Sequence, residues 1–184
     1  MTYDLPASLE VCGVNYEIRT DYRAILDILV ALSDIDLNEQ ERAFVALSIF
    51  YPDIEKMPPD DYQEALNRCF WFINCGEDEP PAEKSPKLVD WEQDFPRIAA
   101  PVSRIVGKDI RTVELHWWSF MAAYMEIGDC LFAQIVRIRE RQAKGKALDK
   151  TDKEFYRKNR HWVDFKQRFS EQETDLLRVF GAYK

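Results

Sequence analysis

An uncharged run at residues 115–125 constrains the fold of this chain more than any other segment. Residues 116–120 read His-Trp-Trp-Ser-Phe, so large aromatic side chains would project from several sides of a helix. A helix that is apolar all round is normally buried. We therefore predict a long central helix with Thr112 as its N-cap, running towards Arg141, with Gly128 as a weak point near its middle.

The N-terminal region predicts a small β-hairpin over residues 8–18. Apolar and polar residues alternate in residues 9–11 and 14–18, on either side of Cys12 and Gly13. Cysteine is not a preferred first residue of a hairpin turn, so the pattern leaves the turn type open. A lone hairpin is marginal in water and must pack on something or be extended, so its edge is a candidate interface.

The rest of the chain carries apolar residues at helical spacing. Prolines interrupt the stripe at residues 91–105, so the helix there is expected to begin late or to kink. The other helix starts are marked by caps, capping-box patterns and an N-terminal Pro pair. These starts are Thr20, Asn38 with Glu41, Pro58-Pro59, Thr151 with Glu154, and Ser170 with Glu173.

These elements predict a mainly α fold, a multi-helix globular domain with a small N-terminal β-hairpin. The 184 residues suit a single domain, 1–184. It would comprise the hairpin 8–18, a helical body 20–143 and basic C-terminal helices 150–184. Residues 77–87 contain three prolines among charged and small residues, and we interpret them as a surface linker within the helical body.

Cysteine and histidine usage gives no metal or disulfide pattern. Cys12, Cys69, Cys75 and Cys130 form no Cys-x-x-Cys pair, and we expect them to be reduced, small core residues. The two histidines lack neighbouring ligands of the kind that a zinc site needs. Acidic residues near 90–94 match no calcium loop and are expected to cap a helix or face solvent. We therefore expect no metal and no cofactor.

The sequence contains no pattern typical of a catalytic site. The six glycines form no phosphate-binding loop, and neither histidine stands in a hydrolase motif. His116, near Ser119, is more simply explained as a hydrogen-bonded core or boundary residue. We therefore expect a protein that is not an enzyme.

Charge is unevenly distributed along the chain. Residues 1–100 contain 21 Asp and Glu against 8 Lys and Arg, a net charge of −13, whereas residues 101–184 carry +5. Such asymmetry can steer the encounter with a charged partner or pair two copies head to tail. The same charge distribution would also arise if the two halves of the chain only formed two differently solvated surfaces. Aromatic residues within the basic region invite a nucleic-acid interpretation, but the acidic half would repel phosphates, so we do not favour it.

Five short motifs occur in an order that resembles the bacteriophage gene-product-fifteen family, over about residues 5–165. They are Leu5-Pro6; Tyr16-Glu17-Ile18 with Thr20-Asp21-Tyr22-Arg23; Phe70-Trp71-Phe72-Ile73 before Gly76; Asp90-Trp91-Glu92 with Asp94; and His116-Trp117-Trp118 with Phe120. The resemblance implies a siphophage tail assembly chaperone that binds the tape measure protein, the tail tube protein or other tail assembly proteins. The alternative is a tail completion or connector protein that stays in the virion.

A chaperone of this kind would act in the host cytoplasm and be absent from the mature virion. The start of the chain has no signal-peptide pattern, and no run is long enough to cross a bilayer, so we expect no membrane partner. Self-association is a further option. The candidate partner-binding residues are one member of the tryptophan pair and the basic tract: Trp117, Trp118, Arg137, Arg139, Arg141, Lys144, Lys146 and Lys150.

Overall fold

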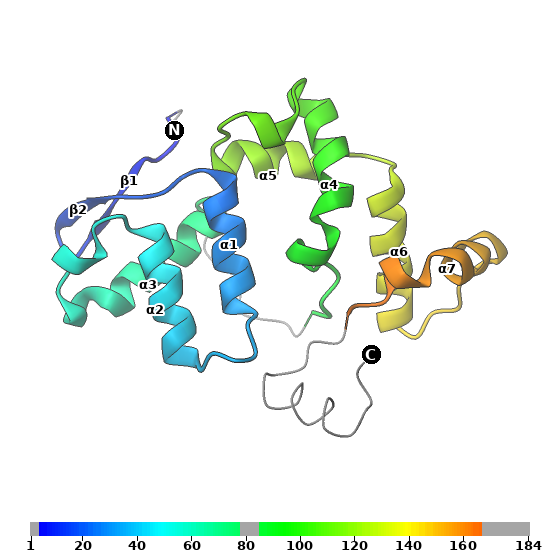
Figure 1. Ribbon diagram of the computed structural model, residues 1–184, viewed down its shortest axis with the longest axis horizontal. Helices are drawn as coiled ribbons and strands as arrows, with labels where there is room; N and C mark the ends of the chain where they lie inside the picture. Colours follow the sequence, from blue (N-terminus) through cyan, green and yellow to red (C-terminus); the bar gives the residue numbers. More distant parts are fainter. Residues whose placement is uncertain (1–3, 78–84, 167–184) are drawn as a thin grey trace.

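The computed structural model describes residues 4–77 and 85–166. Within them the fold is mainly α with one two-stranded antiparallel hairpin, as predicted. Figure 1 shows the hairpin and α1–α3 at one end of the molecule, α6 and α7 at the other, and α4 and α5 between them. The elements are β1 (Ser8–Val11), β2 (Val14–Glu17), α1 (Tyr22–Leu32), α2 (Glu39–Phe50), α3 (Tyr62–Ile73), α4 (Trp91–Val106), α5 (Trp117–Met125), α6 (Leu131–Ala143) and α7 (Lys150–Val163), with 3₁₀ turns η1 (Ile54–Lys56), η2 (Pro59–Asp61) and η3 (Ile110–Thr112).

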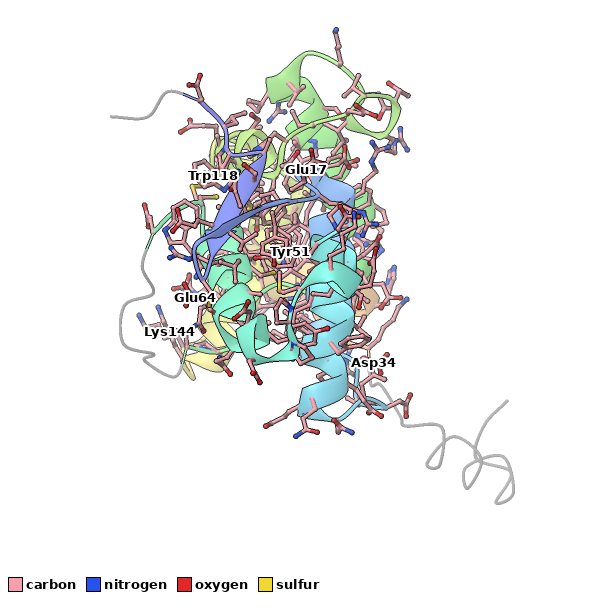
Figure 2. The ribbon with its side chains drawn as sticks, turned by 90° about the vertical axis from the view of Figure 1, so that its left-hand side faces the viewer. Glu17, Asp34, Tyr51, Glu64, Trp118 and Lys144 are labelled. Carbon is pink, nitrogen blue, oxygen red and sulfur yellow. The ribbon has the colours of Figure 1, made fainter. Side chains whose placement is uncertain are left out.

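The predicted hairpin is confirmed, with Val11 opposite Val14 next to the turn. Cys12 and Gly13 both have positive φ, 49° and 83°, which is the conformation of a type I′ turn. The alternation in the sequence places Leu9 and Val11 in the core. The hairpin thus covers the α2–α3 end of the molecule, in front of the buried Tyr51 (Figure 2), whose ring Tyr16 approaches edge-on at 6.2 Å between centroids.

Side-chain caps fix most helix starts. The capping box of α2 is present as predicted: the Asn38 side chain accepts from the Glu41 N–H, and the Glu41 carboxylate accepts from the Asn38 N–H. The predicted cap of α1 is wrong by one residue, because Asp21 and not Thr20 accepts from the helix. The cap of α7 is Asp149 rather than Thr151, and its carboxylate accepts from the Asp152 N–H.

Helix α4 departs from the expectation of a late start. It begins at Trp91, directly after its N-cap Asp90, and continues past both prolines to Gly107. Pro101 is buried, so its ring contributes to the core although it cannot donate a backbone hydrogen bond. Gly107 ends the helix with φ of 77°, in the left-handed conformation that glycine adopts most readily.

The single long helix predicted from Thr112 to Arg141 is wrong. The chain forms α5 and α6 instead, separated by a turn in which Gly128 has φ of 60°. Each helix has its own N-cap, since the His116 ring accepts from the Trp118 N–H and the Cys130 sulfur accepts from the Ala133 N–H. The glycine expected to weaken one helix therefore separates two.

Among the described residues, the buried apolar side chains form two clusters. The larger one joins the hairpin and α1–α5 with Phe132 at the start of α6. The smaller one lies between α6 and α7 and is built on Ile135, Ile138 and Val163. The C-terminal helices therefore pack on each other through a small apolar core of their own. The predicted helix at Ser170 lies outside the described residues.

The cysteines are all free thiols, but they are not all core residues as expected. Cys69 is buried and Cys12 is exposed in the hairpin turn. Burial raises the pKa of Cys69 to about 12. A hydrogen bond with Asp61 also raises the pKa of the Cys12 thiol.

These environments predict selective alkylation. At neutral pH iodoacetamide should label Cys12 of the native protein, and it should label Cys69 about 100-fold more slowly or only after unfolding, because alkylation needs an accessible thiolate. Peptide mass spectrometry over a time course measures both rates. Equal labelling of the two thiols in the native protein would contradict the burial of Cys69.

Candidate functional site

The tryptophan pair lies mainly within the fold. Trp117 is 1% exposed, and its indole N–H donates to the Ile73 carbonyl at 2.8 Å. Trp118 is half-buried and donates in the same way to the Phe72 carbonyl, also at 2.8 Å. Both indoles therefore bind carbonyls at the C-terminal end of α3. Burial removes Trp117 from the candidate partner contacts and leaves only the partly exposed Trp118.

His116 connects the N-terminal segment to α5. Its Nδ1 accepts from the Trp118 N–H, so Nε2 carries the proton and donates to the Pro6 carbonyl at 3.1 Å. At the same helix start, the backbone N–H of Trp117 donates to the Thr20 carbonyl at 2.7 Å. The histidine is therefore a hydrogen-bonded boundary residue, in agreement with the simpler of the two interpretations.

Arg139 is a buried structural residue, which corrects its assignment to a partner surface. Its side chain is 3% exposed, and its guanidinium makes a bidentate pair with the fully buried Asp94 at 2.6 and 3.0 Å. The guanidinium also donates to the carbonyls of Leu88, Trp162 and Val163 at 2.7–2.9 Å. All five N–H donors are used, so Arg139 joins α4, α6 and the end of α7.

Asp94 likewise departs from the expectation of a capping or solvated carboxylate. It accepts from Arg139 and from the Asp90 N–H, at 2.9 Å for the latter, with no side-chain exposure. Asp90 does cap α4 as expected, with its carboxylate accepting from the Gln93 N–H. Two acidic residues four positions apart therefore have different roles, one at the helix start and one in the core.

The rest of the predicted basic tract is at the surface. Arg137 is 53% exposed and pairs with the buried Asp152 at 2.8 Å. Arg141 is half-buried and donates to the Ala147 carbonyl, whereas Lys144 is exposed and pairs with Glu140. Lys146 and Lys150 are exposed in the turn between α6 and α7 and at the start of α7.

Helix α7 extends this surface with a stripe of exposed cations. Lys150, Lys153 and Arg157 recur at helical spacing, opposite the buried positions of the helix. No described carboxylate lies within ion-pair distance of these three residues or of Lys146. We call Lys146, Lys150, Lys153 and Arg157 the basic face. It presents four cations available to an acidic partner.

The hairpin presents the second candidate surface. The Ile18 N–H donates to the Ala7 carbonyl, so the alternation of an antiparallel pair directs the backbone groups of Asn15 and Glu17 away from β1. Both residues are exposed, and so is Val14, at 50%. Within the described residues no third strand pairs with this edge. The edge is therefore open to strand addition.

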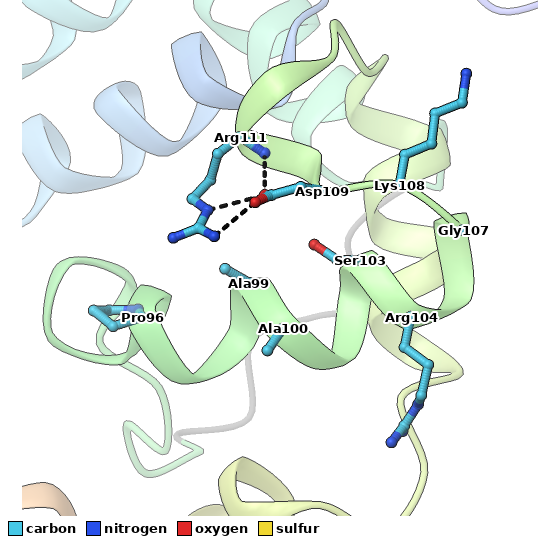
Figure 3. A pocket seen from close by; sticks show the side chains of 9 residues that line it. All are labelled: Pro96, Ala99, Ala100, Ser103, Arg104, Gly107, Lys108, Asp109 and Arg111. Atoms are coloured by element: carbon cyan, nitrogen blue, oxygen red, sulfur yellow. Dashed lines mark hydrogen bonds and ion pairs between the residues drawn. The ribbon is translucent and has the colours of Figure 1, made fainter.

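A shallow pocket of about 550 Å³ lies beside α4 and η3 (Figure 3). Its one carboxylate, Asp109, pairs with Arg111, which lowers the pKa of Asp109 to about 2. Its one hydroxyl, Ser103, accepts from the Ile110 N–H. These polar groups serve the turn after α4, and the lining offers Ser103 no neighbouring histidine or free carboxylate as a base.

Within residues 4–77 and 85–166, no three His, Cys, Asp or Glu side chains come together in a way that could hold a metal ion. In the same ranges, no helix combines the length and apolar character needed to span a membrane.

Comparison with protein families identifies the chain. A family model described as Bacteriophage Gp15 protein matches residues 1–165. The chain belongs to the bacteriophage Gp15 family. Neither the curated proteins nor the solved structures contain a significant match to it.

The Gp15 match extends over every helix and strand that the structure describes, since α7 ends at Val163. The motifs that carry the family resemblance meet in space. Trp117 contacts Ile73 through its indole N–H and lies 6.1 Å from Trp91 between ring centroids, and the Tyr22 ring stacks on Phe120 at 4.7 Å. These Gp15 motif residues therefore build the core, and they do not by themselves mark a binding site.

A groove between α1 and α4 was not expected from the sequence. It encloses about 300 Å³ and is lined by Leu26, Val30, Trp91 and Phe95, with Arg23, Asp27 and Glu92 also in its lining. The apolar positions of each helix were readable, but the groove depends on how two helices pack that are separated by residues 33–90 of the chain. No local pattern encodes that arrangement, so the sequence of this Gp15 protein gave no direct signal for it.

Proposed function

We propose that this Gp15-family protein is a tail assembly chaperone of phages with long non-contractile tails. It would act in the host cytoplasm on the tape measure protein or the tail tube protein, without catalysis, and leave before the virion is complete. The observation that carries the proposal is the basic face, four exposed cations outside the ion pairs of the described residues. Such a surface suits acidic segments of a helical partner.

The physical need for a chaperone follows from the partner. A long helical protein with extensive apolar surface aggregates unless that surface is covered until assembly. The open β2 edge and the partly exposed Trp118 offer further contacts beside the basic face. Electrostatic attraction would bring the partner to the protein, and these weaker contacts would allow its release.

Charge reversal on the basic face tests the proposal. We expect the variant Lys146→Glu/Lys150→Glu to capture about tenfold less tape measure or tube protein than the wild type on co-expression with the neighbouring tail genes, since tenfold corresponds to about 1.4 kcal/mol. Affinity capture with quantitative mass spectrometry measures the loss. The matched control is Lys56→Glu/Lys108→Glu, an equal charge change at two exposed lysines outside the basic face. Equal losses for both variants, or no loss for the first, would contradict the role of the basic face.

The structure also supports a second candidate, a tail completion or connector protein. The acidic hairpin, α2 and α3 lie at the opposite end of the molecule from the basic α6–α7 region (Figure 1). Opposite charges at two ends favour head-to-tail stacking of copies. This candidate requires the protein to be present in purified virions and to associate with itself, which light scattering at high concentration would reveal.

A further inference from the structure

The groove between α1 and α4 has apolar walls of the same pattern on both helices. On α1, Leu26 and Val30 lie one helical turn apart. On α4, Trp91 and Phe95 lie one helical turn apart. Leu26 is 9% exposed and the other three side chains are half-buried, so an apolar surface reaches solvent here. Four residues rise about 6 Å along a helix, so the walls match one turn of a partner helix.

The size of the groove favours protein side chains over a cofactor. The groove encloses about 300 Å³, or about ten waters at bulk density, which is the lower limit of pockets that hold small molecules. Release of that water from apolar walls favours an apolar occupant. One or two side chains from a helix that lies across the groove match this volume.

Carboxylates at the rim give the groove a negative charge. Asp27 on α1 and Glu92 on α4 are both exposed, and both belong to the lining. Asp27 takes part in none of the ion pairs formed by the described residues. The cation in the described lining, Arg23, already makes a bidentate pair with Asp21 at 2.7 and 2.9 Å. The charge that remains for a partner is therefore negative.

Apolar walls beside carboxylates match the chemistry of lysine and arginine. Each of these side chains carries an aliphatic stem that packs on apolar surface and a cationic head that stays in water. The stem would lie along Val30 and Phe95, with the head beside Asp27. Aromatic rings such as those of Trp91 and Phe95 also attract cations. A large apolar side chain one turn away on the same partner helix would fill the rest of the groove.

We infer that the groove between α1 and α4 binds a basic amphipathic helix of another protein, which inserts one large apolar side chain and a lysine or arginine three or four positions away. The apolar side chain packs against Val30 and Trp91, and the cation pairs with Asp27. This site selects the opposite charge from the basic face, so the two surfaces would hold different segments. The inference is independent of the proposed chaperone function, because it concerns the chemistry of the bound segment and not the protein that carries it.

Peptide display on the full-length protein tests the inference. Random peptides of about 12 residues would be selected on the wild type, after removal of those that also bind the variant Val30→Glu. We expect the selected peptides to carry a lysine or arginine within four positions of a large apolar residue, because a negative groove with apolar walls selects both. Circular dichroism checks the fold of each variant, and Asp27→Lys replaces Val30→Glu in the counter-selection if the latter is unfolded.

Calorimetric affinities of the strongest selected peptide then measure the role of charge. Asp27→Lys should weaken binding about tenfold, because it replaces attraction by repulsion at the rim. The matched control is Glu10→Lys, the same change of charge at an exposed glutamate on β1, and it should alter the affinity less than about twofold. The affinity of the wild type should also fall as the salt concentration rises, as expected for a partly exposed ion pair.

Three outcomes would overturn the inference. The first is no enrichment of peptides on the wild type relative to the counter-selected variant. The second is selection of peptides without cations, or equal losses of affinity for Asp27→Lys and Glu10→Lys, since the groove would then not select charge. The third is self-association of the wild type at high concentration that both Asp27→Lys and Val30→Glu abolish, which would assign the groove to a second copy of this chain.

Discussion

Arg139→Ala should destabilise the protein by about 3–5 kcal/mol, because it leaves the buried Asp94 carboxylate without its counter-ion. The substitution removes two hydrogen bonds to Asp94 and three to the carbonyls of Leu88, Trp162 and Val163. Asp94 keeps its contact with the Asp90 N–H, which cannot replace a guanidinium. Urea denaturation followed by circular dichroism measures the change in the free energy of unfolding.

Two further variants separate this cause from a general loss of charge. Arg157→Ala removes an exposed cation of the basic face and should cost less than about 1 kcal/mol. Adding Asp94→Asn to Arg139→Ala should recover part of the lost stability, since it removes the uncompensated charge. An Arg139→Ala protein within 1 kcal/mol of the wild type would show that the pair is not buried as described.

Trp117→Ala should cost about 3–5 kcal/mol, the range expected for deleting a large buried aromatic side chain. Its ring stacks on Phe120 at 5.5 Å and lies 6.1 Å from Trp91, so its removal opens a cavity where several motif residues meet. Trp117→Phe should cost about 1 kcal/mol from the lost hydrogen bond, plus a smaller cavity. The same denaturation measurement applies to both variants.

Trp118→Ala is the matched control, because it removes the same side chain from the adjacent position. Trp118 is half-buried and touches Gly76, where a Cβ atom would lie 3.0 Å from the Trp118 ring. Its loss should therefore cost clearly less than that of Trp117. If Trp118→Ala proved the more damaging of the two, the assignment of Trp117 to the core would be wrong.

The sequence was most informative where a few neighbouring residues decide the structure. The hairpin follows from alternation around a two-residue turn, and the α2 capping box follows from Asn38 and Glu41 three positions apart. The wrong prediction of one helix in place of α5 and α6 also depended on a single local residue. Gly128 could weaken a helix or separate two, and its left-handed conformation decides for separation.

The burial of Arg139 could not be predicted by counting the charged residues of its tract. It lies in a tract rich in lysine and arginine, yet its burial depends on Asp94, 45 residues earlier in the chain. A signal was present in the sequence, because Phe132, Ile135 and Arg139 follow the spacing of one helix face and the first two are apolar. A cation on an apolar stripe predicts a buried partner, whereas Arg137, two residues earlier, faces solvent.

The candidate site was predictable only in outline. Four of the predicted cations, Arg137, Lys144, Lys146 and Lys150, are exposed, but only the structure separates those already paired from those of the basic face. Lys153 and Arg157 were missed as site residues, although their spacing from Lys150 was readable. The aromatic motifs could be read directly from the sequence and identify the family, but in the structure they form the core of the protein and do not mark a binding site.

The most direct test of a chaperone role compares two samples from one infected or induced culture. Quantitative mass spectrometry would be applied to proteins captured with the tagged chain and, in parallel, to purified virions. If the protein is a chaperone, we expect tape measure or tail tube protein in the captured complexes and none of this Gp15-family protein in the virions. A fixed number of copies of this protein in every virion would contradict it and establish a structural tail component instead.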